Sequence, residues 1–127
     1  MNIYSKGSKS VTTAPKRDLL TCTVSGQQTI GVVSAWEYSK MRVGKSFPEG
    51  GFLPNQYSPV DLFDDDFKET KVHQVILSPG DCIYIPAHWW HQALSTDQGT
   101  TLAINFWYDS SSSWADMVMK GIAEGTL

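Results

Sequence analysis

The residues of this chain best suited to bind a metal are its three histidines, because a neutral imidazole nitrogen is a common metal ligand. They are His73, His88 and His91. His88 and His91 flank the junction between a proline turn and a strand, so we do not expect them to hold one metal together. Zinc accepts two histidines and an acidic residue, and a site made from His73, His91 and an acid is one alternative that the spacing does not require. We expect His88, beside the proline turn, to be a surface residue.

His91 lies in the most informative segment of the sequence. Pro79-Gly80 forms a turn before an alternating strand, Pro86 ends that strand, and Trp89-Trp90-His91 opens the next one. The His91 side chain is expected to face the interior of a barrel, and one or both tryptophans to fill it. Together with residues 103–108 (Ala-Ile-Asn-Phe-Trp-Tyr), this segment resembles the C-terminal half of a JmjC-type cupin. The resemblance is closest to the asparaginyl and lysyl hydroxylase branch, whose enzymes depend on iron and 2-oxoglutarate.

The resemblance implies an iron site of two histidines and one carboxylate, with His91 as the last metal ligand. The first two ligands of the family come from a His-x-Asp or His-x-Glu motif on an early strand. The matching stretch, residues 10–26, contains no histidine. Pro15 or Lys16 stands where the first histidine belongs, and Asp18 stands in the carboxylate position under the second of these registers. One aspartate and one histidine make a poor iron site, so His91 is expected to be a vestigial ligand.

The position of the co-substrate lysine also departs from the family pattern. Where the family has Gly-x-Lys, this chain has Gly26-Gln27-Gln28. Gln28 can hydrogen-bond a carboxylate but cannot neutralise it, and a charge-assisted hydrogen bond is about twice as strong as a neutral one. Asn105 and Trp107 match positions at the 2-oxoglutarate end of the pocket, although ordinary core roles explain both residues equally well. We therefore expect a retained barrel with a vestigial pocket and no cofactor.

Length and composition predict a single small domain. The chain has 127 residues, 41% of them hydrophobic, which is enough for one core. The predicted fold class is all-β: a double-stranded β-helix of the cupin or jelly-roll type, JmjC-like, with a long inserted loop and a C-terminal α-helix. We divide it into a barrel, residues 1–109, and a helical tail, residues 110–127. The net charge of −3 offers no basic stripe for nucleic acid, and no apolar run is long enough to insert into a membrane.

Eight segments have the alternation of strands, the number that a double-stranded β-helix needs. They are residues 2–5, 10–13, 19–25, 29–34, 71–77, 81–85, 89–94 and 101–108. The long insertion 35–70 begins with one or two helical turns at 36–41 and continues as a Gly- and Pro-rich loop at 44–59. In JmjC enzymes the equivalent stretch helps to wall the substrate cleft.

The two cysteines are informative about the cellular compartment of the protein, because thiols stay reduced inside cells. Cys22 and Cys82 each lie within a predicted strand among apolar neighbours, and we expect buried, reduced thiols. The first seventeen residues have a composition found in mitochondrial transit peptides, but they align with the first barrel strands. We therefore expect an intracellular protein, cytoplasmic rather than mitochondrial.

The clearest helix of the sequence is at its end. Ser113 can cap it and Gly125 is a natural stop. One face of this helix is apolar at helical spacing and carries Trp114, Met117, Val118 and Ile122. Two alternatives stay open: this apolar stripe packs on its own barrel, or it docks on a protein partner or a second copy of the chain.

Three hypotheses on function follow from these observations. The first is a non-catalytic JmjC-like domain, a pseudoenzyme that acts as a structural or protein-interaction subunit. The second is an iron(II) and 2-oxoglutarate dependent protein hydroxylase with an atypical site. The third is a cupin that binds a small molecule without redox chemistry. We favour the first, because it explains the missing ligands, the missing lysine and the apolar tail together.

Overall fold

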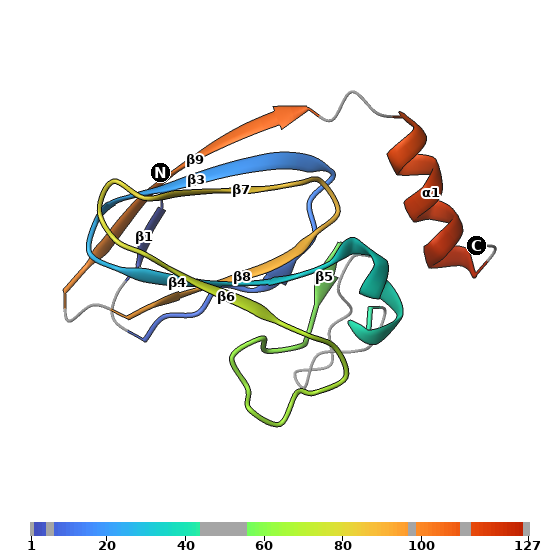
Figure 1. Ribbon diagram of the computed structural model, residues 1–127, viewed down its shortest axis with the longest axis horizontal. Helices are drawn as coiled ribbons and strands as arrows, with labels where there is room; N and C mark the ends of the chain where they lie inside the picture. Colours follow the sequence, from blue (N-terminus) through green and yellow to red (C-terminus); the bar gives the residue numbers. More distant parts are fainter. Residues whose placement is uncertain (1, 5–6, 44–55, 97–98, 110–112, 126–127) are drawn as a thin grey trace.

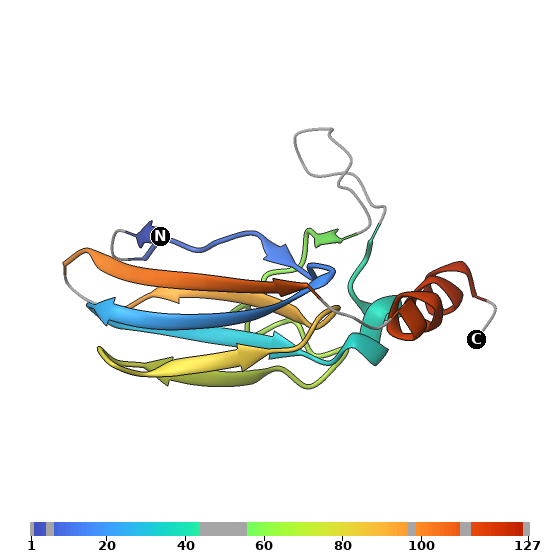
Figure 2. The ribbon, with the colours of Figure 1, turned by 90° about the horizontal axis from the view of Figure 1, so that it is seen from above.

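The computed structural model describes residues 2–4, 7–43, 56–96, 99–109 and 113–125. Two antiparallel sheets face each other, and the C-terminal helix lies at one end of them (Figures 1 and 2). The strands are β1 (Asn2–Tyr4), β2 (Thr12–Thr13), β3 (Arg17–Ser25), β4 (Gln28–Val33), β5 (Tyr57–Ser58), β6 (His73–Leu77), β7 (Cys82–Ile85), β8 (Trp90–Ser95) and β9 (Thr101–Asp109). The helices are the 3-10 helix η1 (Ala35–Lys40) and α1 (Ser113–Glu124). The predicted all-β double-stranded β-helix is confirmed.

The strand order shows how the chain winds between the sheets. Sheet A has the order β1-β9-β3-β7, and sheet B has the order β5-β2-β8-β4-β6. Strands that follow one another in sequence mostly lie in opposite sheets, as in a jelly roll. All eight predicted strands are present, with bounds that differ by a few residues. The two-residue strand β5, which pairs with β2, was not predicted.

The space between the sheets holds one apolar core. It is built from Leu19 of β3 and Ile85 of β7 on one side, and from β4, β6 and β8 on the other. The buried members on sheet B are Ile30, Val32, Leu77 and Ala93. Trp89 packs against this core from just before β8. Alternate residues of a strand share a face, so these core residues and the strand pairing together show which other side chains point into the space between the sheets.

A second core lies on the outer side of sheet B. It contains the fully buried Trp90, Val33 and Met41, together with Val60 and Leu62. Successive residues of a strand point to opposite sides, so Trp90 enters this core while His91 faces the interior. The described parts of the insertion supply the cover, because η1 and residues 56–70 fold back over the sheet. Of the two tryptophans considered for the barrel interior, Trp89 therefore packs there and Trp90 does not.

The outer side of sheet A carries exposed aromatic side chains. Leu20 lies opposite Tyr84 on one neighbouring strand and opposite Phe106 on the other, so the three share one face. Tyr108 is on the same face, two residues beyond Phe106. Tyr84, Phe106 and Tyr108 are 45–55% exposed. We call this surface, Leu20, Tyr84, Phe106 and Tyr108, the aromatic face.

The two cysteines do not have the state that we predicted. Cys22 of β3 and Cys82 of β7 are direct neighbours across the two strands and form a disulfide. Cys22 is half-buried and Cys82 is exposed, so neither is a buried thiol. The two residues are 60 positions apart in sequence, and only the pairing of β3 with β7 brings them together. Reduced cysteines therefore no longer support the expectation of an intracellular protein.

The C-terminal helix is present as predicted. It spans Ser113–Glu124, and Gly125 follows with a φ of +76°, a left-handed conformation that suits glycine. α1 packs against η1 at one end of the barrel. In the described part of the chain, no helix is both long and apolar enough to span a membrane.

Candidate functional site

The position of His91 agrees with the orientation expected from the sequence. In β8 it lies opposite Thr13 of β2 and Val32 of β4, and Val32 belongs to the interior core. Directly opposite residues share a face, so the imidazole is on the interior side of sheet B. Its Nδ1 is buried and has no hydrogen-bond partner in the described part of the chain. An unpaired buried imidazole nitrogen is a feature that a metal site would explain, so the neighbouring donors decide the question.

Burial sets the charge of the imidazole. It lowers the pKa of His91 to about 4, and a backbone hydrogen bond with Trp89 only partly opposes this. The ring is therefore neutral at physiological pH. A neutral imidazole can bind a metal, but it is also the form that a buried histidine adopts with no metal present.

The other positions of the expected iron site do not offer the donors that iron needs. Asp18, the one candidate carboxylate, lies in sheet A and accepts hydrogen bonds from Tyr84 Oη and the Ala87 amide, each at 2.7 Å. The Pro15 carbonyl accepts from the His88 amide at 2.8 Å. Among the described residues, no three His, Cys, Asp or Glu side chains lie close enough to share a metal ion. The described residues thus do not fit an iron centre.

The matching position of the co-substrate lysine is part of the folded interior. Gln28 is fully buried at the start of β4, and its Nε2 donates to Thr23 Oγ1 at 3.1 Å. This bond holds the buried amide against β3, so at least one of its two N–H groups is used within the fold. Gly26, the glycine that precedes Gln27 and Gln28, is required by the fold itself. Its φ is +77°, and a Cβ there would lie 2.7 Å from Thr101 Oγ1.

Asn105 and Trp107 lie on the interior side of sheet A. Asn105 is opposite Thr21 and Trp107 is opposite Leu19, both of which are buried. Trp107 is near the end of β9 and remains exposed, with the Arg17 guanidinium 5.1 Å from the centre of its ring. This cation–π contact was not predicted, since it depends on the pairing of β3 with β9. The structure therefore puts His91, Asn105 and Trp107 on facing sides of the two sheets, and their role as a vestigial pocket stays a prediction.

The two remaining histidines differ from expectation in different ways. His88 is buried rather than on the surface, and its φ of +70° is uncommon for a residue with a side chain. His73 is exposed on the edge strand β6 and lies opposite Val32, which separates it from His91. With no third ligand grouped around them in the described part of the chain, the zinc alternative has no support.

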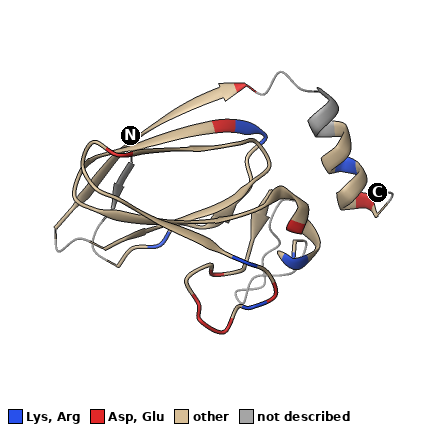
Figure 3. Ribbon diagram, in the orientation of Figure 1, with Lys and Arg blue, Asp and Glu red and all other residues tan. Residues whose placement is uncertain are grey.

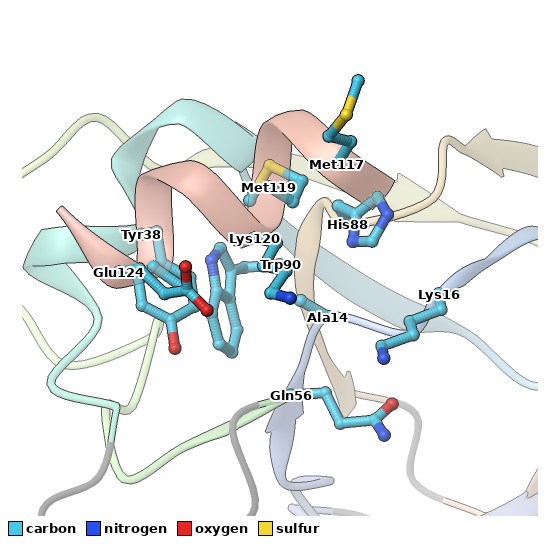
Figure 4. Close-up of a pocket in the computed structure, with 11 residues that line it drawn as sticks. Ala14, Lys16, Tyr38, Gln56, His88, Trp90, Met117, Met119, Lys120 and Glu124 are labelled. Atoms are coloured by element: carbon cyan, nitrogen blue, oxygen red, sulfur yellow. The ribbon is translucent and has the colours of Figure 1, made fainter. Parts of the chain in front are cut away.

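A cleft that the sequence did not predict lies between α1 and the end of the barrel (Figure 4). Its volume is about 540 Å³. The lining comes from five separate segments: the link between β2 and β3, η1, the residue before β5, the end of the β7–β8 link with the start of β8, and α1. Its lining includes Lys16, Tyr38, Trp90, Met119, Lys120 and Glu124. No local pattern reveals such a cleft, because it exists only where these segments meet.

Both the geometry and the comparisons with known proteins define the class of this protein. Two antiparallel sheets with jelly-roll connections are the cupin architecture, and a family model described as a cupin-like domain matches residues 7–113. The chain therefore belongs to the cupin-like domain family. A curated relative that carries the Jumonji C name supports the JmjC type of cupin.

Three curated relatives illustrate the similarity. HSPB1-associated protein 1 of Bos taurus is 42% identical over 56 residues, 44% of this chain and 11% of that protein. Lysine-specific demethylase 8 of Xenopus tropicalis is 29% identical over 77 residues, 56% of this chain and 17% of that protein. Jumonji C domain-containing protein 5 of Drosophila melanogaster is 37% identical over 41 residues, 32% of this chain and 10% of that protein. The chain thus matches less than a fifth of the length of each.

Solved structures agree on the fold. The structure of Drosophila melanogaster CENP-C bound to CAL1 aligns with a TM-score of 0.52 at 11% identity, over 83% of this chain and 56% of that one. Oxalate oxidase aligns with a TM-score of 0.55 at 8% identity, over 84% of this chain and 39% of that one. At such low identity these likenesses establish the cupin fold and nothing about activity.

Proposed function

We propose that this chain is a non-catalytic JmjC-type cupin domain that acts as a structural or protein-interaction subunit. The observation that carries the proposal is that two residues aligned with the family's iron and co-substrate positions are hydrogen-bonded within the protein. Asp18 is hydrogen-bonded to Tyr84 and Ala87, and Gln28 is hydrogen-bonded to Thr23. In each case the side chain at the aligned position already makes hydrogen bonds within the fold.

The exposed apolar surface supports the interaction part of the proposal. Soluble proteins rarely leave contiguous apolar patches open unless something binds there. The aromatic face crosses three adjacent strands of sheet A, whereas the outer side of sheet B is covered by the chain's own insertion. Aromatic residues are also the type most enriched where proteins bind one another.

The C-terminal helix offers a second surface of the same kind. Met117 is 65% exposed, and Val118 and Ile122 are half-buried; the side chain of Trp114 lies outside the described residues. Most helix residues that line the cleft, Met119 and Ala123 among them, are on another side of α1 than Val118 and Ile122. The apolar stripe is thus only partly covered by its own barrel, which favours docking on a protein partner or a second copy.

The names of two similar proteins point in the same direction. HSPB1-associated protein 1 is named for an association with another protein, and the CENP-C cupin structure was solved bound to CAL1. For this chain, protein binding by a cupin domain is therefore a proposal with precedent in the fold.

Iron binding and 2-oxoglutarate turnover test the non-catalytic part. The full chain is incubated without oxygen with iron(II), desalted and analysed for metal, and succinate is measured after 2-oxoglutarate and oxygen are added. We expect substoichiometric iron and no succinate above the level without protein, because one histidine cannot supply the geometry that holds iron(II). One equivalent of iron, or succinate formation that His91→Ala abolishes and His73→Ala leaves intact, would show that the chain is an atypical hydroxylase.

A further inference from the structure

The cleft beneath α1 is separate from the vestigial pocket. Trp90 lines the cleft and His91 faces the interior, and adjacent residues of a strand point to opposite sides of the sheet. The cleft is not lined by His91, Asn105 or Trp107. Its volume of about 540 Å³ is within the range of sites that bind small molecules, roughly 300–1,000 Å³.

The floor of the cleft contains an unsatisfied hydrogen-bond donor. Trp90 is fully buried, and its Nε1 has no partner in the described part of the chain. An indole N–H can only donate, so it needs an acceptor, and a buried donor without one is costly. Figure 4 shows the indole nitrogen turned toward α1, which covers this N–H but provides no acceptor for it. A ligand oxygen placed between the helix and the ring would satisfy it.

The walls next to this donor are apolar. The Tyr38 ring lies 6.0 Å from the Trp90 ring, measured between centroids, at an angle of 48°. Burial raises the pKa of Tyr38, so its hydroxyl stays neutral and uncharged. Ala14 adds to the apolar lining on the barrel side, and Met119 and Ala123 add to it on the helix side. These walls favour a ligand with a hydrocarbon or aromatic body.

The charged groups of the cleft favour an anion. Figure 3 shows basic residues at the start of β3 and on α1. Lys16 lines the cleft from the barrel side and Lys120 from the helix side (Figure 4). Neither ammonium group forms an ion pair with any described residue. Against these two cations stands one carboxylate, Glu124, at the end of the cleft near Tyr38. The ammonium groups are therefore available to a ligand carboxylate.

We propose that this cleft binds a small organic carboxylate with an apolar body. The body packs against Tyr38, Trp90 and Met119, and the carboxylate pairs with Lys16 and Lys120. One of its oxygens accepts the hydrogen bond of the Trp90 indole once the side chains of α1 make room for it. The site goes beyond the proposed interaction function, because it lies on the opposite side of sheet B from His91 and Gln28, although it shares Lys16 with the aligned position of the first histidine.

Decanoate, below the concentration at which it forms micelles, is the probe for calorimetric titration of the full chain. We expect saturable binding of one decanoate per chain, and at least tenfold weaker binding of decan-1-ol, which has the same body without the charge. The double variant Lys16→Gln with Lys120→Gln should weaken decanoate binding at least tenfold. The matched control Lys71→Gln removes an exposed lysine outside the cleft and should change the affinity less than twofold.

Nuclear magnetic resonance adds a direct readout of the donor. The indole N–H signal of Trp90 is the one that disappears in Trp90→Phe, and in the wild-type chain it should shift on titration with decanoate. The proposal is overturned by the absence of saturable binding, by equal affinity in the double lysine variant and the wild type, or by a Trp90 signal that does not move. If Trp90→Phe does not fold, stepwise exchange of single tryptophans elsewhere assigns the same signal by elimination, and the lysine comparison stands unchanged.

Discussion

Replacing Trp90 with alanine should be among the most destabilising single changes in this protein. Trp90 is fully buried in the outer core, where it packs with Val33, Met41 and Leu62. Truncating a buried tryptophan costs about 3–5 kcal/mol, since the lost burial is joined by the cavity that remains. A domain of this size is stable by about 5–15 kcal/mol, so Trp90→Ala removes a large fraction of the total.

Urea denaturation followed by circular dichroism measures this change, and Trp36→Ala is its matched control. Trp36 is 67% exposed on η1, so its removal should alter the free energy of unfolding by no more than about 0.5 kcal/mol. The melting temperature of Trp90→Ala should fall by about 10–20 °C. If the two variants lose similar stability, or if Trp90→Ala loses less than about 1 kcal/mol, the outer core does not hold the insertion on sheet B as we infer.

Two further predictions concern His91 and the C-terminal helix. Burial holds the pKa of His91 at about 4 in the folded chain, below its ordinary value of 6.5. Between these two pH values only the unfolded chain binds a proton, so the contribution of neutral His91 to the free energy of unfolding is complete above pH 6.5. It falls as the pH approaches 4, by up to about 3 kcal/mol. Urea titrations across this range should show a smaller loss in His91→Gln, and equal slopes in both proteins would refute the assignment. Met117→Lys with Ile122→Lys should disperse an assembly formed through the apolar stripe while changing the melting temperature little. Light scattering that shows a monomer before and after the change, with a sharply lower melting temperature, would mean that the stripe packs on its own barrel.

The strands were predictable because their side chains alternate. In residues 101–108 the buried residues, Thr101 and Ala103, follow the two-residue period that an antiparallel sheet imposes. β5 has no such signal, since two residues cannot show a period and Tyr57–Ser58 is a strand only through its pairing with β2. Local pattern therefore identified the long strands and missed the one that depends wholly on a distant partner.

The position of Trp90 and the state of the cysteines escaped prediction for the same physical reason. The sequence indicates that Trp89 and Trp90 are core residues, but not that two separate cores exist, because the second one forms only when the insertion folds over sheet B. The state of Cys22 depends on the register that puts it opposite Cys82. In both cases the deciding contact joins segments far apart in the chain, which composition and periodicity do not report.

The departures from the family pattern are visible in the sequence, whereas the present roles of these positions are not. The residue types of Pro15, Lys16, Asp18 and Gln28 are enough to identify a site without its expected donors. Their present roles depend on contacts between strands: the Asp18 carboxylate ties the end of β7 to β3, and the Gln28 amide ties β4 to β3.

The imidazole of His91 does not require a metal, since a buried ring that stays neutral is compatible with the barrel whether or not a metal is present. The fold alone therefore cannot distinguish an enzyme from a binding domain. The distinction rests on the other functional positions, where the carboxylate and the amide are committed to hydrogen bonds within the protein. If these positions serve the fold alone, as we propose, the barrel can still be bound from outside, and the exposed aromatic face and the half-covered helix are the surfaces that we propose for this binding.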